Sequence, residues 1–211
     1  MKTIKILAGA ATLVLFGWQA QSQTPLETST SSDARFMREF KTTTPPRGYV
    51  EFCRSHPRDC AAARTRPVLM KMSRSRWNEL NAINSNVNHV VQPTTDLQLH
   101  GRNEVWSYPK DYGDCEDYVL LKRKQLIQKG WPKNTLLITV LRDENNDGHA
   151  VLTVVTDMGD LILDNKVGLI RPWSDTPYTY YLRQSRSDPR KWVNLSTTDL
   201  GTRPTATIAG R

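Results

Sequence analysis

The sequence predicts an α+β protein in which a helical first part packs on an antiparallel β-sheet formed by the second part. Two observations support this fold class. The first part of the body carries apolar residues at steps of three and four, whereas the second part carries β-branched and aliphatic runs separated by short turns. With 211 residues, 38% of them hydrophobic, the chain can form one ordinary domain or two small lobes around a hydrophobic core.

Two helices are expected in the first part. One buried helical face is indicated by four apolar residues at helical spacing: Trp77, Leu80, Ile83 and Val87. Ser73 or Ser75 is available as the N-cap of this helix. A second helix is indicated by apolar residues between positions 119 and 127, and Gly130 followed by Pro132 marks its end.

Three strands are expected next, at residues 136–142, 149–156 and 160–164. Residues 143–148 and 157–159 have turn compositions, and such short connections make neighbouring strands antiparallel. A further strand, or a cover for the sheet, is expected from the aromatic residues that follow: Trp173, Tyr178, Tyr180 and Tyr181.

The N-terminus has the pattern of a secretory signal peptide. Lys2 and Lys5 precede an apolar stretch at residues 6–16, and small residues follow at Ala20 and Ser22. The stretch is about half as long as the ~20 residues that a membrane-spanning helix needs, so residues 1–22 are expected to be a cleaved signal, with an uncleaved membrane anchor as the alternative.

Composition divides the rest of the chain into three parts. Residues 23–46 are rich in Ser, Thr and Gln and are expected to form a flexible arm or linker. Residues 47–195 are expected to form the folded domain, and residues 196–211 a C-terminal tail. The formal net charge is +8, but the basic residues are dispersed and mixed with acids. A solvated basic surface is therefore expected, and no motif supports nucleic-acid binding.

Three cysteines are too few for a disulfide scaffold, and their odd number leaves at least one thiol unpaired. Cys53 and Cys60 flank a polar loop and are expected to form a disulfide in an oxidising compartment. A metal site using both cysteines with His56 and Asp59 is the alternative, although its spacing matches no recognised zinc site. Cys115 then remains as the free thiol.

Cys115 stands in the string Gly-Asp-Cys-Glu-Asp at residues 113–117, directly before the second predicted helix. Asp114 suits the N-cap and Asp117 the third helical position, which approximates a capping box. The helix dipole and the free backbone N–H groups favour a thiolate, whereas the adjacent carboxylates raise the pKa of a thiol. An imidazolium or a bound cation is needed to settle this balance.

His149 begins the second predicted strand and Asp164 ends the third, which gives the order Cys, His, Asp of a papain-like or transglutaminase-like site. If a four-residue turn makes Val155 face Asp160, His149 and Asp164 are diagonal neighbours on one face, roughly 7 to 8 Å apart at the backbone. A three-residue turn would place them on opposite faces. In the first case Cys115 attacks a carbonyl carbon, His149 transfers the proton and Asp164 orients the imidazole. Taken singly, the three residues also fit a buried inert thiol, a half-exposed histidine and an aspartate that ends a strand.

These motifs resemble the bacterial transglutaminase-like cysteine proteinases, also known as peptidase family C93. The resemblance spans about residues 47–195 and is carried by short stretches: Gly-Asp-Cys-Glu-Asp-Tyr at 113–118, Gly-His-Ala-Val-Leu at 148–152, Leu-Asp-Asn at 163–165, Asn84–Asn88, Asp96 and the Cys53/Cys60 segment. It implies a papain-like or transglutaminase-like α+β fold and endopeptidase activity. It also implies a catalytic triad of Cys115, His149 and Asp164.

The same resemblance implies a compartment, a cofactor and partners. The family includes periplasmic Lap-type proteases that release large biofilm adhesins, so a periplasmic location, a protein substrate such as a surface adhesin and an inner-membrane regulatory receptor are expected. Some members bind calcium beside the nucleophile, which points to Asp114, Glu116 and Asp117 as Ca²⁺ ligands here. Hard oxygen ligands suit Ca²⁺, and a bound cation would offset the like charges around Cys115.

Two other functions stay open from the sequence. The same thioester chemistry could transfer an acyl group to an amine, as in a transglutaminase or amidase, and a non-catalytic calcium-dependent binding module would keep the fold without the reaction. A second acidic stretch, at residues 143–148, matches the opening of a calcium loop, but its twelfth position is Val154 instead of Glu. We expect a polar hairpin turn there.

Overall fold

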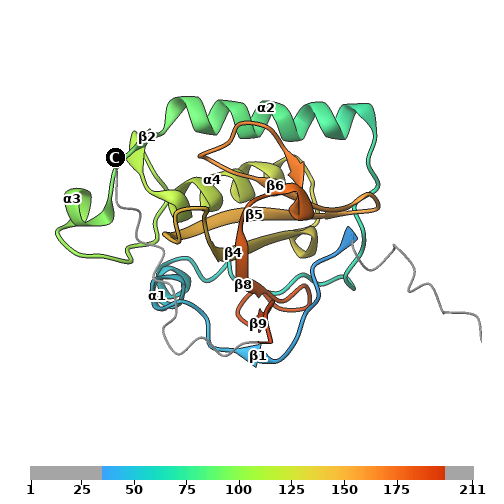
Figure 1. The fold of residues 1–211 in the computed structure, drawn as a ribbon, viewed down its shortest axis with the longest axis horizontal. Helices are drawn as coiled ribbons and strands as arrows, with labels where there is room; N and C mark the ends of the chain where they lie inside the picture. The colour runs from blue at the N-terminus through green and yellow to red at the C-terminus, as the bar shows by residue number, and fades with distance from the viewer. Residues whose placement is uncertain (1–34, 198–211) are drawn as a thin grey trace, which may run out of the picture.

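A seven-stranded antiparallel sheet with helices packed against it forms the body of the protein in a computed structural model, which describes residues 35–197 (Figure 1). The sheet has the order β1-β9-β8-β4-β5-β6-β7, and its strands are β1 (Thr42–Thr43), β4 (Leu136–Arg142), β5 (Gly148–Thr156), β6 (Gly159–Leu163), β7 (Arg171–Pro172), β8 (Thr179–Gln184) and β9 (Trp192–Asn194). Two further strands, β2 (Gln92–Pro93) and β3 (Tyr112–Gly113), form a short parallel pair. The predicted α+β class is confirmed.

Four α-helices precede the main strands, as predicted for a helical first part. They are α1 (Arg47–Ser55), α2 (Arg74–Val90), α3 (Asp96–His100) and α4 (Cys115–Gln128), with short 3-10 helices at Lys133–Thr135 and Trp173–Asp175. Figure 1 shows α2 running along one side of the molecule above α4, and α4 contacts both α2 and the central strands β4 and β5. Helix α4 is thus enclosed between α2 and the sheet, so that its polar as well as its apolar residues are buried.

Helix α2 follows the predicted pattern. Its side chains at Leu80, Ile83 and Val87 are buried, and the Ser73 side chain accepts a hydrogen bond from the backbone N–H of Arg76. Of the two candidate serines, Ser73 is therefore the N-cap of α2. In the part of the chain that the structure describes, no helix combines the length and the apolar character needed to cross a membrane.

The register of β5 and β6 is that of the four-residue turn, the first of the two cases considered from the sequence. Val155 pairs with Asp160, and Thr156 pairs with Gly159. The tip of the hairpin is therefore only two residues long, and Gly159 has a φ of 119°, a conformation that favours glycine. This register directs one face of both strands into the core and fixes which residues end next to each other at the far end of the hairpin.

Residues 35–46 are not a loose arm, and in this stretch the prediction is wrong. The backbone N–H of Met37 donates to the Asp160 carboxylate at 2.9 Å, and Thr42 pairs with Val193 in the sheet. Polar composition misled the prediction because backbone pairing at a sheet edge needs no apolar side chain. The expected signal at residues 1–22, and most of the tail at 196–211, lie outside the described residues.

Cys53 and Cys60 form the predicted disulfide, with their Cα atoms 5.6 Å apart. Closing so short a loop stabilises a fold by about 2 kcal/mol in the chain-entropy model. Replacing both cysteines by Ala is therefore expected to lower the free energy of unfolding by about this amount, measured by urea denaturation. Reduced wild-type protein should show the same loss, whereas an unchanged unfolding midpoint in both samples would contradict the prediction.

Candidate active site

The fold brings the three predicted triad residues to one place. Cys115 is the first residue of α4, His149 is the second residue of β5, and Asp164 directly follows β6. Helix α4 packs on β5, and β5 pairs with β6, so the nucleophile approaches the sheet at the end where the histidine and the aspartate meet.

His149 and Asp164 are joined by a buried hydrogen bond of 2.9 Å between Nε2 and Oδ1. Asp164 also accepts hydrogen bonds from the Tyr178 hydroxyl at 2.6 Å and from the backbone N–H of Lys166 at 2.9 Å. Burial alone would raise the pKa of Asp164, but the hydrogen bonds from His149 and Tyr178 outweigh it and hold this pKa below its usual value. Asp164 is therefore an ionised partner that orients the imidazole.

The two ring nitrogens of His149 have different surroundings. Nε2 is engaged by Asp164, whereas Nδ1 is buried and has no hydrogen-bond partner within residues 35–197. Because an ionised carboxylate only accepts hydrogen bonds, Nε2 carries a proton, and in the neutral imidazole the lone pair is then on Nδ1. Nδ1 is thus the nitrogen that can take a proton from a thiol.

Cys115 lies against the same strand, but its thiol is held in the protonated form. The side chain is fully buried, the backbone N–H of Ala150 is directed at the sulfur, and the thiol donates a hydrogen bond of 3.0 Å to the Glu116 carboxylate. Burial, followed by the charges of Glu116 and Asp114, raises the pKa of Cys115 well above its usual value. The adjacent carboxylates therefore outweigh the helix N-terminus as long as they carry charge.

The expected capping box is not formed. Asp114 is the N-cap residue of α4, but its side chain makes no capping hydrogen bond. Asp117 instead accepts hydrogen bonds from the backbone N–H of Ser107, at 2.7 Å, and from its hydroxyl. The prediction fails because the loop before β3 supplies a donor that spacing along the helix cannot reveal.

Gly113 permits the close approach of the Gly-Asp-Cys-Glu-Asp string to its own helix. A Cβ atom at this position would lie 2.8 Å from both Cβ and Oδ2 of Asp117, closer than such atoms approach in proteins. Any larger residue would therefore displace Asp117 or the start of α4, which carries Cys115.

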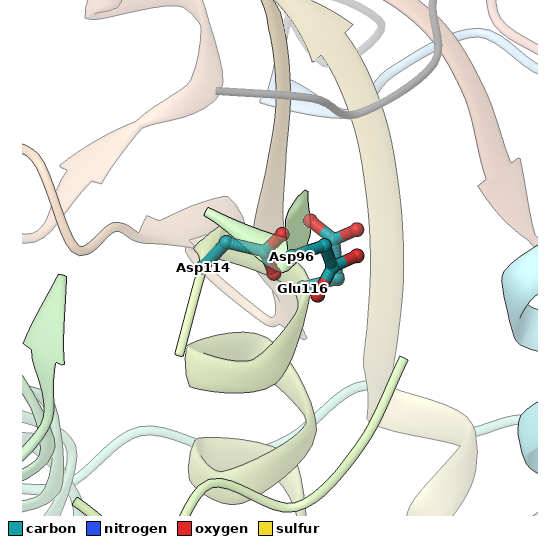
Figure 2. A group of neighbouring side chains, drawn as sticks. All are labelled: Asp96, Asp114 and Glu116. Carbon is teal, nitrogen blue, oxygen red and sulfur yellow. The ribbon is translucent and has the colours of Figure 1, made fainter. Parts of the chain in front are cut away.

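Three buried carboxylates gather above the first turn of α4: Asp96, Asp114 and Glu116 (Figure 2). One oxygen of each lies within 4.8 Å of the others. Within the described residues, Oδ1 of Asp114 and Oε1 of Glu116 are buried without a hydrogen-bond partner. Burial, followed by the charge of Asp96, raises the pKa of Asp114 to about 7; burial and the charge of Asp114 raise that of Glu116.

This carboxylate cluster fits a calcium ion by its chemistry. Its donors are hard oxygen atoms, two of them without hydrogen-bond partners, and their mutual repulsion would be relieved by a divalent cation. Asp114 and Glu116 are two of the three predicted ligands, whereas the third, Asp117, lies outside the cluster. Asp96 takes the remaining place; the sequence marked it only as part of a family resemblance.

Asp96 is brought to the cluster by local structure around α3. The Thr95 side chain caps this helix in a capping box with Gln98, and the Asp96 carboxylate accepts a hydrogen bond of 2.5 Å from the backbone N–H of Val105. The box Thr-x-x-Gln is visible in the sequence and could have indicated a helix start there. Nothing in the spacing, however, indicates that Asp96 would face α4.

A cavity of about 220 Å³ lies beside Asp164, which forms part of its wall together with Tyr178. Most of its remaining lining is apolar, including Ile162, Val167 and Leu169. The cavity therefore offers a largely apolar space next to the Asp164 carboxylate.

The second acidic stretch is a hairpin turn, as predicted. It joins β4 to β5, and the Asp143 carboxylate accepts hydrogen bonds from the backbone N–H groups of Asn145 and Asp147 and pairs with Lys166. Its acidic residues thus stabilise the turn.

Solved structures of LapG from Legionella pneumophila are similar to part of this chain. One matches at 26% identity with a TM-score of 0.46, over 51% of this chain and 63% of that chain. The calcium-bound and the EGTA-treated forms match at the same identity and TM-score, over 64% and 62% of their chains. The match thus spans less than two thirds of each LapG chain, and no curated protein matches.

Residues 39–200 match the family model of the bacterial transglutaminase-like cysteine proteinases. The match covers far more than half of the chain and includes Cys115, His149 and Asp164. This chain therefore belongs to the bacterial transglutaminase-like cysteine proteinase family, a family of cysteine peptidases.

Proposed function

We propose that this protein is a cysteine endopeptidase in which Cys115 is the nucleophile, His149 the general base and acid, and Asp164 the residue that orients the imidazole. The observation that carries the proposal is the buried hydrogen bond from His149 Nε2 to the ionised Asp164, which leaves Nδ1 for the thiol. A structural histidine would need neither an ionised partner nor a second nitrogen kept free in the interior.

The reaction follows from these roles. The proton of the Cys115 thiol passes to His149 Nδ1, and the sulfur attacks the carbonyl carbon of the substrate peptide. The backbone N–H of Cys115, at the start of α4, is a donor for the resulting oxyanion. Collapse of this intermediate releases the amine, which takes the proton from His149, and leaves a thioester. Water then adds to the thioester with His149 as base, the C–S bond breaks, the Cys115 sulfur takes back the proton from His149, and the new carboxylic acid is released.

We also propose that the carboxylate cluster holds Ca²⁺ through Asp96, Asp114 and Glu116, with Asp117 adjacent to it. When bound, the ion would supply the positive charge that offsets these carboxylates next to the thiol. Glu116 is the link between the two sites, because its carboxylate accepts the hydrogen bond of Cys115. With Glu116 engaged by a cation, the Cys115 proton would be free to move to His149.

The proposed location is the periplasm, after removal of residues 1–22 as a signal. The disulfide between Cys53 and Cys60 supports export, because such bonds persist in oxidising compartments. The proposed substrate is a protein, and family membership favours a surface adhesin whose cleavage is regulated by an inner-membrane receptor. The cavity beside Asp164 would accept an apolar side chain of this substrate.

The proposal is tested by alkylation of Cys115 with iodoacetamide in the purified mature protein with Ca²⁺ present. A His149→Ala variant is expected to label at least tenfold more slowly at neutral pH, because the thiol loses its base. The matched control is His89→Ala, which changes an exposed histidine in the last turn of α2. Equal labelling of wild type and His149→Ala would remove the imidazole from thiol activation. Mass analysis of products formed with and without an added amine separates hydrolysis from acyl transfer.

A further inference from the structure

One lysine is completely buried beneath the candidate active site. Lys122 has a relative exposure of 0% and stands seven residues after Cys115 on α4. Seven residues are close to two helical turns, so the two side chains share one face of the helix, about 10 Å apart along its axis. Lysine is almost never fully buried unless it is paired.

The Lys122 ammonium group has no hydrogen-bond partner among residues 35–197. Its described neighbour is the ring of Tyr118, whose centre lies 5.9 Å from Nζ. Burial lowers the pKa of Lys122 to about 7, and the charge of Asp164 opposes this shift. Asp164 is thus an acidic group close enough to favour the charged form of Lys122.

Two asparagines of α2 hold the backbone next to that carboxylate. Asn88 donates a hydrogen bond of 2.8 Å to the carbonyl oxygen of Asp164, and Asn84 donates one of 2.9 Å to that of Gly168. The side-chain oxygens of both asparagines are buried and have no partner in the described chain. Helix α2 packs directly on α4. The same helix pair therefore contains Lys122, which has unused hydrogen-bond donors, and the amides of Asn84 and Asn88, which have unused acceptors.

Packing alone does not explain this lysine. Replacing a buried charge by an apolar side chain of similar volume is often neutral or stabilising, because the desolvation of the charge is removed. A methionine at this position would fill nearly the same space without a buried charge. The lysine is therefore a candidate for a role in the site above it and not for a role in stability.

Building on the proposed protease function, we propose that Lys122 is a positioning residue of the triad. The amides of Asn84 and Asn88 hold the backbone of the segment that follows β6, and the buried Lys122 ammonium group adds a positive charge that favours the anionic form of Asp164. His149 then stays oriented with Nδ1 available to Cys115. Lys122 itself touches neither the thiol nor the substrate.

The first test compares Lys122→Met with Leu126→Ala, a change at another fully buried position of α4. Two quantities are measured with Ca²⁺ present: the rate of Cys115 alkylation by iodoacetamide and the thermal unfolding midpoint. Lys122→Met is expected to label at least tenfold more slowly with an unchanged or higher midpoint. Leu126→Ala is expected to unfold several degrees earlier, while its folded fraction labels within twofold of wild type.

The outcomes separate a positioning role from a structural one. Labelling of Lys122→Met at the wild-type rate would overturn the proposal. Should this variant not fold, Lys122→Gln is measured in the same way; failure of both to fold would assign Lys122 a structural role and also overturn the proposal. Failure of wild type to label at Cys115 would instead refute the proposed function, so the two failures are distinguishable.

A second test asks whether Lys122 acts through Asp164. Lys122→Met is introduced into an Asp164→Asn background, in which the carboxylate charge is absent. If Lys122 acts by supporting that charge, its replacement changes the labelling rate less than twofold in this background. Equal slowing in both backgrounds would show that Lys122 acts by another route, which contradicts the proposal.

Discussion

Asp164→Asn is expected to lower kcat for peptide cleavage by about 10⁴-fold at neutral pH with the fold intact, as in other triads that lose this charge. Asparagine has nearly the shape of aspartate, so the packing around Tyr178 should survive. Its neutral amide, however, cannot stabilise the imidazolium that forms when His149 takes the thiol proton. It also does not enforce the tautomer that leaves Nδ1 free.

The measurement is the appearance of new amino groups from a denatured protein such as casein, with Ca²⁺ present. The matched control is Asp175→Asn, which changes an exposed aspartate in the 3-10 helix before β8. The control should cleave at the wild-type rate. Activity of Asp164→Asn within tenfold of wild type would exclude Asp164 from the proposed triad. Thermal unfolding of each variant confirms that folded proteins are being compared.

Removal of calcium by EGTA is expected to slow alkylation of Cys115 at least a hundredfold. Without a cation, burial and the adjacent Glu116 and Asp114 carboxyl groups keep the Cys115 thiol protonated, as its raised pKa indicates. Calcium bound at a hundred times its Kd would also stabilise the fold by about 2.7 kcal/mol. For a chain of this size, that corresponds to a rise of roughly 5 to 10 °C in the unfolding midpoint.

The stabilisation by calcium should grow with pH. Burial raises the pKa of Asp114 to about 7, whereas an unfolded aspartate ionises near 4. A carboxyl group with a raised pKa contributes stability below its unfolded pKa and loses it as the pH rises through the folded value. The calcium-free protein therefore loses stability between about pH 4 and 7, and the ion should raise the unfolding midpoint more at pH 8 than at pH 5.

The same experiment identifies the ligands. Asp96→Asn and Glu116→Gln should lose the calcium-dependent rise in the unfolding midpoint. Asp147→Asn, in the acidic turn between β4 and β5, should keep it. If EGTA changes neither the unfolding midpoint nor the labelling rate of wild type, the result would contradict a calcium site in the carboxylate cluster.

The sequence was most informative where structure is set locally. The period of apolar residues predicted α2 and α4, and the short turn between β5 and β6 left only two registers to consider, of which the observed one places His149 and Asp164 on one face. Because a shift of one residue reverses every side chain in a strand, this single register carried the prediction of the triad geometry.

Features that depend on distant segments were not predictable in the same way. Asp96 joins the cluster only because α3 and the following loop fold back onto α4. Strands β1 and β9 are two and three residues long, too short to show a period. The unpaired interior lysine at position 122 likewise departs from the apolar pattern expected of a buried helix.

The pairing of β1 with β9 joins the two ends of the described chain, as Figure 1 shows. Thr42 can pair only after Val193 has been synthesised, so β1 cannot join the sheet while the C-terminal part of the chain is still being made. A nascent chain would therefore remain incompletely folded until β9 has been synthesised, which makes the domain intolerant of truncation before this strand. Cutting the chain before Trp192 should leave Thr42 and Thr43 without their partner strand.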